Sequence, residues 1–287
     1  MNRPSHNTPL HDYGSMPLLT LRKPESTLPW ESKQRIIHLP KSHTTLESFK
    51  PNRIMSLVFL ILLTLASCQE KDEQTPPRVD HHTSDTIRFS YLALGDSYTI
   101  GTALPDSSRS YPIQLIERLN EDSLLEGAKP SIVAFGGWRT DQLILGIDTA
   151  DLDQTYDLVS LLIGVNNQFQ NRPLDVYGME FEQLLETAIQ FAGNDTNRVF
   201  VLSIPDYGVT PAGEGNAEIS QEIDIYNDII QDIAESYAVD YFNITEISRM
   251  AEDNVELLAP DSLHPSGDMY ELWVNEILDD VKAKLYE

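Results

Sequence analysis

The sequence predicts an α/β domain over residues 87–287, with a parallel β-sheet covered by helices on both faces. Three observations predict it. Short apolar runs of strand length alternate with amphipathic stretches of helical length, and each apolar run ends at Gly, Asn or Pro. The 287 residues contain 41% hydrophobic and 23% charged side chains, which is ordinary for a chain that folds around a packed core.

The predicted strands and helices follow one another along the chain. Strands are expected at residues 87–94, 131–135, 158–163, 199–204 and 239–242, which are dominated by Val, Ile, Leu, Phe and Tyr as in strands buried on both faces. Helices are expected at residues 111–120, 140–147, 177–192, 218–237 and 267–285. In the fourth helix the apolar side chains recur at helical spacing, which predicts a core face formed by Ile219, Ile223, Tyr226, Ile229, Ile230 and Ile233.

The region before this domain has a different character. Residues 1–54 are rich in Pro, Ser, Thr and His and lack a sustained period, so we expect them to be disordered or to lie upstream of the true translation start. Residues 55–67 form an uncharged apolar run. A spanning helix needs roughly 20 such residues, whereas a signal peptide needs about 7–15, so the length favours a signal peptide over residues 55–68.

The apolar run ends at Cys68, the only cysteine in the chain. Residues 65–68, Leu-Ala-Ser-Cys, resemble a bacterial lipobox, in which the thiol is lipidated and the preceding peptide is removed. This resemblance implies a lipid-anchored protein of the bacterial cell envelope, held at the outer membrane or cell surface, with residues 69–86 as a flexible tether. The alternative is a buried hydrophobic helix with an incidental cysteine.

Charge and residue usage exclude several classes of function. The formal net charge is −25 and the sequence pI is about 4.4, so a nucleic acid would be repelled and acidic substrates are disfavoured. One cysteine excludes disulfide frameworks and Cys-rich zinc sites. After residue 82 the only histidine is His264, which excludes a two-histidine zinc site in the domain. We therefore expect no metal and no cofactor; the sequence does not indicate an oligomeric state.

Polar residues follow the first three predicted strands, where ligands of parallel sheets bind. After the first strand comes Gly95-Asp96-Ser97, which can present a serine hydroxyl at a helix start or form an ordinary Asx turn. After the second comes Gly136-Gly137, where a free Gly137 amide can donate to a developing oxyanion. After the third, Asn166 offers a side-chain donor for the same point; a plain loop is the alternative for both segments.

A fourth polar segment lies near the C-terminus. Asp261 and His264 are three residues apart in a loop flanked by prolines, so the carboxylate can accept from the imidazole Nδ1 and leave Nε2 to act as a base. An exposed Asp–His pair is the alternative, and it is weakened because His264 is the only histidine of the domain.

Taken in order, the segments around Ser97, Gly137, Asn166 and His264 resemble the four consensus blocks of the SGNH/GDSL hydrolases, over residues 91–273. The resemblance implies a three-layer α/β/α sandwich with a flavodoxin-like five-stranded parallel sheet. It also implies that Ser97 is the nucleophile, that His264 is the general base oriented by Asp261, and that Ser97, Gly137 and Asn166 form the oxyanion hole. This sequence departs from the usual blocks by Asn167 in place of Asp, and by Gly136 in place of Ser or Thr.

The same resemblance predicts a serine ester hydrolase that cleaves small carboxylic esters through an acyl-enzyme. The expected substrates are O-acetyl groups on glycans or short-chain acyl esters; a lysophospholipase or thioesterase, and a lipid-tethered non-catalytic glycan- or ester-binding protein, are the alternatives. Candidate substrate contacts are Asp96, Trp138, Asn167 and Asp206, and the loop of Asp206 also offers Tyr207 and Thr210. The loops do not specify the acyl group or the alcohol.

Overall fold

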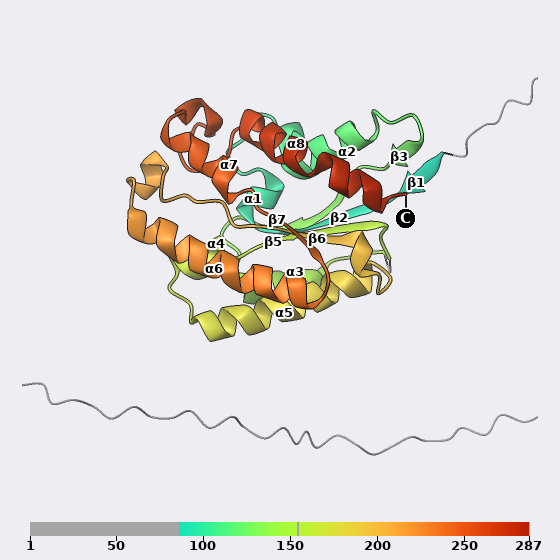
Figure 1. The fold of residues 1–287 in the computed structure, drawn as a ribbon, viewed down its shortest axis with the longest axis horizontal. Coiled ribbons are helices and arrows are strands. Elements are labelled where there is room, and N and C mark those ends of the chain that lie inside the picture. Colours follow the sequence, from blue (N-terminus) through green and yellow to red (C-terminus); the bar gives the residue numbers. More distant parts are fainter. Residues whose placement is uncertain (1–85, 154, 287) are drawn as a thin grey trace, which may run out of the picture. The chain divides into compact units, whose positions relative to one another are not determined.

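A five-stranded parallel sheet forms the centre of the domain (Figure 1). The computed structural model describes residues 86–153 and 155–286. The strands are β2 (Tyr91–Gly95), β4 (Ser131–Ala134), β5 (Leu158–Leu162), β6 (Val199–Leu202) and β7 (Asp240–Phe242), in the spatial order β4-β2-β5-β6-β7. Every residue of the three inner strands is buried, whereas the edge strands β4 and β7 are partly exposed, which explains why the inner strands are continuously apolar.

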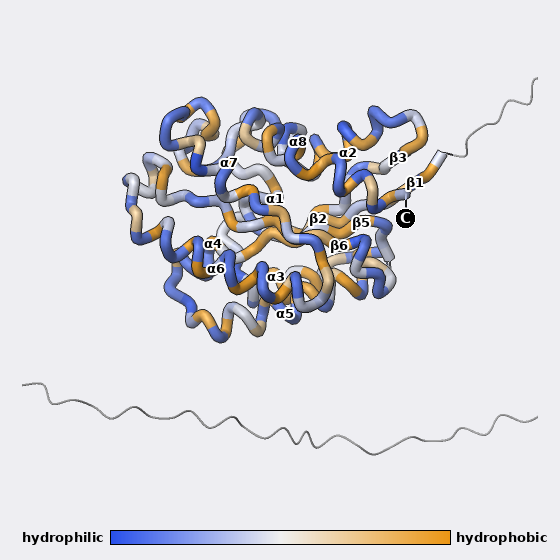
Figure 2. The backbone as a smooth tube through the Cα atoms, in the orientation of Figure 1, coloured by the Kyte–Doolittle hydropathy of each residue, from blue (hydrophilic) through white to orange (hydrophobic). Residues whose placement is uncertain are grey.

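Helices cover both faces of this sheet. On one face lie α1 (Ser97–Ile100), α2 (Tyr111–Leu119), α7 (Thr245–Arg249) and α8 (Gly267–Lys284), and on the other lie α3 (Thr140–Thr149), α4 (Val165–Phe169), α5 (Leu174–Phe191) and α6 (Ala217–Ser236) (Figure 1). Single 3₁₀ turns occur at Ser107–Arg109, Thr196–Arg198, Pro211–Gly213, Met250–Glu252 and Val255–Leu257. Apolar residues gather on the strands and on the inner sides of the helices (Figure 2). The predicted three-layer α/β/α sandwich is confirmed.

The predicted first strand is divided in two. β1 (Ile87–Phe89) pairs with β3 (Leu125–Gly127) in a separate two-stranded parallel sheet, and β2 begins only at Tyr91. Between them, the amide and the hydroxyl of Ser90 both donate to Asp157 Oδ2, at 2.9 Å each, and the Ser90 carbonyl accepts from the Leu158 amide at 3.0 Å. Asp157 and Leu158 hold Ser90 at the start of β5, so the chain leaves the two-stranded sheet at this residue and enters the five-stranded sheet. These partners are 67 or more residues away in the sequence.

The other strands and helices that were predicted start and end within a few residues of their predicted bounds, and local capping explains two of the starts. The Asn216 side chain accepts from the Glu218 amide before α6, and the Ser266 hydroxyl accepts from the Met269 amide before α8. The predicted apolar stripe of α6 faces the core, with Ile223 buried at its centre.

None of the helices described in residues 86–286 has both the length and the apolar character that crossing a membrane requires. The predictions for residues 1–54, for the signal peptide with Cys68 and for the tether up to residue 85 lie outside the described residues.

Candidate active site

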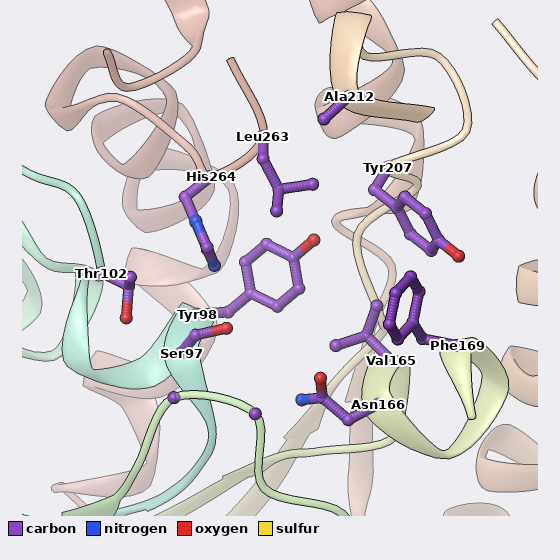
Figure 3. Close-up of a pocket in the computed structure, with 12 residues that line it drawn as sticks. Ser97, Tyr98, Thr102, Val165, Asn166, Phe169, Tyr207, Ala212, Leu263 and His264 are labelled. Carbon is purple, nitrogen blue, oxygen red and sulfur yellow. The ribbon is translucent and has the colours of Figure 1, made fainter. Parts of the chain in front are cut away.

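The turn from β2 into α1 presents Ser97. Gly95 is needed there because a Cβ at this position would lie 2.4 Å from the Leu162 carbonyl oxygen of the neighbouring strand. Asp96 caps the short helix, since its Oδ1 accepts from the Tyr98 amide at 3.0 Å. Ser97 is therefore the first residue of α1. It is buried, and its hydroxyl faces a cavity (Figure 3).

A tight loop holds His264 beside Asp261. The imidazole Nδ1 lies 2.5 Å from Asp261 Oδ2, and Asp261 Oδ1 accepts from the backbone amides of His264 at 3.0 Å and Leu263 at 3.1 Å. The loop is closed by the Ala259 amide, which donates to the His264 carbonyl at 2.7 Å. These contacts fix the ring so that its free nitrogen points toward Ser97 (Figure 3). The structure shows no hydrogen bond between the Ser97 hydroxyl and the ring; such bonds are often long before substrate binds.

The pKa of the Asp261 carboxyl is held below its ordinary value. Partial burial raises it, but the hydrogen bonds from the His264 ring and from the amides of His264 and Leu263 together outweigh burial. Asp261 is therefore a carboxylate at neutral pH and can stabilise a positively charged imidazole.

Two further groups with oxyanion-stabilising potential line the same cavity. Gly137 has φ +83° at the third position of a turn closed by the Trp138 amide, which donates to the Phe135 carbonyl at 3.2 Å. Asn166, in α4, donates from Nδ2 to the Trp138 carbonyl at 2.9 Å, and its amide nitrogen points to the Ser97 side of the cavity (Figure 3). The second and third motif segments are thus joined directly at the point where an oxyanion would form.

Asn167 strengthens this junction. It is fully buried, its Oδ1 accepts from the Thr140 amide at 3.1 Å, and its Nδ2 donates to Thr140 Oγ1 at 2.6 Å. The Thr140 hydroxyl in turn donates to Glu180. An amide at residue 167 is needed here because it must both accept from an amide and donate to a hydroxyl. The residue that departs from the usual motif therefore fastens α4 to the start of α3.

The cavity has a volume of about 330 Å³ and a mostly apolar lining. Its walls are Ser97, Tyr98, Thr102, Gly136, Gly137, Val165, Asn166, Phe169, Tyr207, Ala212, Leu263 and His264. Ser97, Thr102 and His264 lie at one end, whereas Val165, Phe169 and Tyr207 lie at the other (Figure 3). His264 is the only imidazole in this lining, and no Asp, Glu, Lys or Arg belongs to it.

Asp96 lies just beneath this lining. Burial raises the pKa of its carboxyl to about 7, although hydrogen bonds from the Tyr98 amide and the Asn166 side chain oppose the rise. Asn166 Nδ2 is 3.5 Å from Asp96 Oδ2, so this carboxyl is in contact with the side chain that would bind the oxyanion.

The structure brings Ser97, Gly137, Asn166 and His264 to one cavity but places the four candidate substrate contacts outside its lining. Asp96 and Asn167 are fully buried and serve as the cap and clamp described above. The Trp138 indole packs against Gly146 and the Phe135 ring, so only its carbonyl reaches the site. The Asp206 carboxylate is buried and accepts from the Arg249 Nε at 3.0 Å and from the Gly208 amide at 2.8 Å.

Most of the apolar wall was not among the predicted site residues. Tyr98, Val165 and Leu263 each adjoin a motif residue, and Phe169 follows Asn166 by three residues in α4, which places both on one face of that helix. That spacing is the signal that would have found Phe169. Tyr207 was named with its loop, and it does line the cavity.

Within the described ranges, no group of three or more His, Cys, Asp or Glu side chains is placed to hold a metal ion.

The sheet order, the layers and the strand-end cavity are those of the SGNH hydrolase fold. The chain belongs to the GDSL-like lipase/acylhydrolase family, whose model matches residues 93–272. Among curated proteins no match was found.

Solved structures share the fold at low identity. The acetylxylan esterase Axe2 from Geobacillus stearothermophilus is 18% identical with a TM-score of 0.52, over 67% of this chain and 94% of that one. TesA is 14% identical with a TM-score of 0.53, over 68% and 99%. A putative lipolytic protein of the G-D-S-L family from Desulfitobacterium hafniense is 16% identical with a TM-score of 0.51, over 68% and 99%.

Proposed function

We propose that this protein is a serine ester hydrolase that cleaves small, neutral carboxylic esters. The observation that carries the proposal is that Ser97 and a histidine held by a carboxylate, His264 with Asp261 at 2.5 Å, line one cavity together with Gly137 and Asn166. Membership of an acylhydrolase family supports the same chemistry.

The geometry supports a two-step reaction. His264 Nε2 takes the Ser97 proton while Oγ bonds to the ester carbonyl carbon, and the oxyanion accepts from the amides of Ser97 and Gly137 and from Asn166 Nδ2. His264 then returns the proton to the leaving alcohol as the ester C–O bond breaks. Water attacks the acyl-enzyme by the same route and releases the acid. Asp261 stays ionised and stabilises the imidazolium throughout.

The lining of the cavity favours uncharged substrates of modest size. Since it contains no Asp, Glu, Lys or Arg, a charged acyl group or alcohol would lose its hydration without gaining a partner. We propose acetyl esters, including O-acetyl groups on glycans, or other short-chain acyl esters as substrates. One of the similar folds belongs to an acetylxylan esterase, which agrees with this choice.

Hydrolysis of p-nitrophenyl esters from acetate to palmitate tests the proposal. We expect the highest kcat/KM with acetate and butyrate, and loss of about 10³-fold or more of kcat in Ser97→Ala and in His264→Ala. Either variant retaining wild-type kcat with a normal melting curve would falsify the assignment. Activity that rises steadily to palmitate would point instead to a lipid or thioester substrate.

A non-catalytic binding protein on the same fold is distinguished by labelling. A fluorophosphonate reacts only with an activated serine, so the wild-type protein should be labelled and Ser97→Ala should not. Absence of labelling in a folded wild-type protein would favour binding of a glycan or ester without turnover.

We also propose that a lipid on Cys68 anchors the protein to the bacterial envelope; the support is the lipobox resemblance of residues 65–68. Incorporation of radioactive palmitate into the wild type, and none into Cys68→Ser, is the expected result. Residues before Cys68 in the mature protein, found by mass spectrometry, would disprove it.

A further inference from the structure

Tyr207 lines the apolar end of the cavity, at the end opposite Ser97 (Figure 3). Its ring lies 6.3 Å from the Phe169 ring in an edge-to-face arrangement, and it is 8% exposed. Its hydroxyl donates to Gln168 Oε1 at 2.8 Å, so the ring is tied to α4 at its tip.

The backbone of Tyr207 is held as firmly as its ring. The Tyr207 carbonyl accepts from the Thr210 amide at 3.0 Å and from the Thr210 hydroxyl at 2.7 Å. The preceding residue, Asp206, donates its amide to the Ser248 hydroxyl at 2.9 Å and binds Arg249 through its carboxylate. Tyr207 is therefore a fixed wall of the cavity and not a mobile lid.

A second cavity of about 340 Å³ is lined in part by Gln168, the residue that holds the Tyr207 hydroxyl. Its lining is Gln168, Asn171, Arg172, Pro173, Leu174, Glu222, Ile225 and Tyr226. Gln168, the hydrogen-bond partner of Tyr207, belongs to this lining, and its Nε2 donates to Glu222 Oε2 at 2.6 Å. Tyr207 lines the first cavity and its hydrogen-bond partner Gln168 lines the second, so this pair of side chains connects the two linings.

We propose that Tyr207, held by Gln168, sets the upper limit on the length of the acyl group. This inference rests on the proposed esterase function. The oxygen of the leaving alcohol must lie within hydrogen-bond distance of His264, and the carbonyl oxygen of the ester must face Gly137 and Asn166. The acyl chain then extends toward the apolar end formed by Val165, Phe169 and Tyr207, where it stops at the Tyr207 ring.

The test compares kcat/KM for p-nitrophenyl acetate, butyrate, hexanoate and octanoate in the full-length protein. For the wild-type protein, kcat/KM should decline for acyl chains longer than butyrate. Tyr207→Ala removes the wall, so the ratio of kcat/KM for octanoate to that for acetate should rise at least about tenfold, because the added methylenes become buried in the second cavity. Tyr207→Leu, a smaller change, should raise the ratio less and covers the case in which the alanine variant does not fold.

A variant in the second cavity tests whether the longer acyl chain enters it. Ile225 is 47% exposed and lines only the second cavity. Ile225→Trp alone should leave the wild-type chain-length profile unchanged, whereas Tyr207→Ala with Ile225→Trp should lose most of the gain on octanoate.

The outcomes separate this inference from the proposed function. A wild-type protein that hydrolyses no ester refutes the esterase itself. Serine-dependent acetate hydrolysis with the same octanoate-to-acetate ratio in wild type, Tyr207→Ala and Tyr207→Leu overturns only the role of Tyr207. A ratio that rises in Tyr207→Ala and does not fall when Ile225→Trp is added overturns the second cavity as the destination of the chain.

Discussion

The buried carboxyl of Asp96 should make the stability of the domain depend on pH in a way that one substitution removes. Burial raises its pKa from 3.8 to about 7. Below about pH 4 the group is neutral in both the folded and the unfolded chain. As the pH rises toward 7 the unfolded chain loses this proton first, so the free energy of unfolding falls, and above pH 7 the loss is complete. Three pKa units at about 1.4 kcal/mol each set the loss at about 4 kcal/mol.

Asp96→Asn keeps an oxygen that can accept from the Tyr98 amide but cannot ionise. Urea unfolding of both proteins from pH 4 to pH 8 gives the free energy of unfolding at each pH. The stability of the variant minus that of the wild type should grow by up to about 4 kcal/mol between pH 4 and pH 7 and then level off. The variant should also lose activity, because its new amide group faces Asn166 Nδ2, another donor.

Asp106→Asn is the matched control. Asp106 also caps a helical turn, with Oδ1 accepting from the Ser108 amide at 2.9 Å, but it is exposed and its hydrogen bonds lower the pKa. Its stability difference from the wild type should therefore not grow between pH 4 and pH 7. A difference for Asp96→Asn that stays constant over this range refutes the buried ionisable role of Asp96.

Three other substitutions test the site. Asn167→Ala leaves the Thr140 amide unpaired and should cost about 2–4 kcal/mol, or roughly 5–15 °C in Tm; an unchanged calorimetric Tm contradicts the clamp. Gly137→Ala meets no neighbouring atom but strains a backbone with φ +83°, so it should reduce kcat more than Gly136→Ala, and equal kinetics in the two variants would refute this. Asp261→Asn should lower kcat by about 10³–10⁴-fold with little change in KM; its carboxylate stabilises the fold above about pH 4, and that contribution disappears as the pH falls through its lowered pKa.

The sequence predicted the layers and the inner strands because these depend on local patterns. A strand buried on both faces must be apolar throughout, as β5 and β6 are, and such a run is visible without knowing its neighbours. The break at Ser90 was not visible, since it depends on a carboxylate 67 residues away. The short helices α1, α4 and α7 were missed because four or five residues carry no helical period.

The site shows the same division. Ser97, Gly137, Asn166 and His264 were predicted because each follows a strand or lies in a loop with a recognisable motif, and the parallel sheet brings the strand ends together. The Asx turn of Asp96 was the alternative considered for its segment, whereas the structural roles of Asn167 and Asp206 were not predicted. Their side chains are polar and adjoin the site, yet each turns into the protein to satisfy backbone groups or a charged partner, which only the folded chain supplies.

The two carboxyl groups of the site have opposite pKa shifts, and each shift suits the proposed reaction. Asp261 is kept ionised beside the ring that must become positive. Asp96 lies 3.5 Å from the Asn166 amide, and an ionised Asp96 there would repel the developing oxyanion; a pKa of about 7 reduces that charge near neutrality. The neutral side chain of Asn167 also keeps negative charge away from the developing oxyanion, because an aspartate at this position would place a second carboxylate next to Asn166. Asn167→Asp should therefore lower kcat more than it raises KM, and an unchanged kcat would show that charge at this position does not reach the reacting atoms.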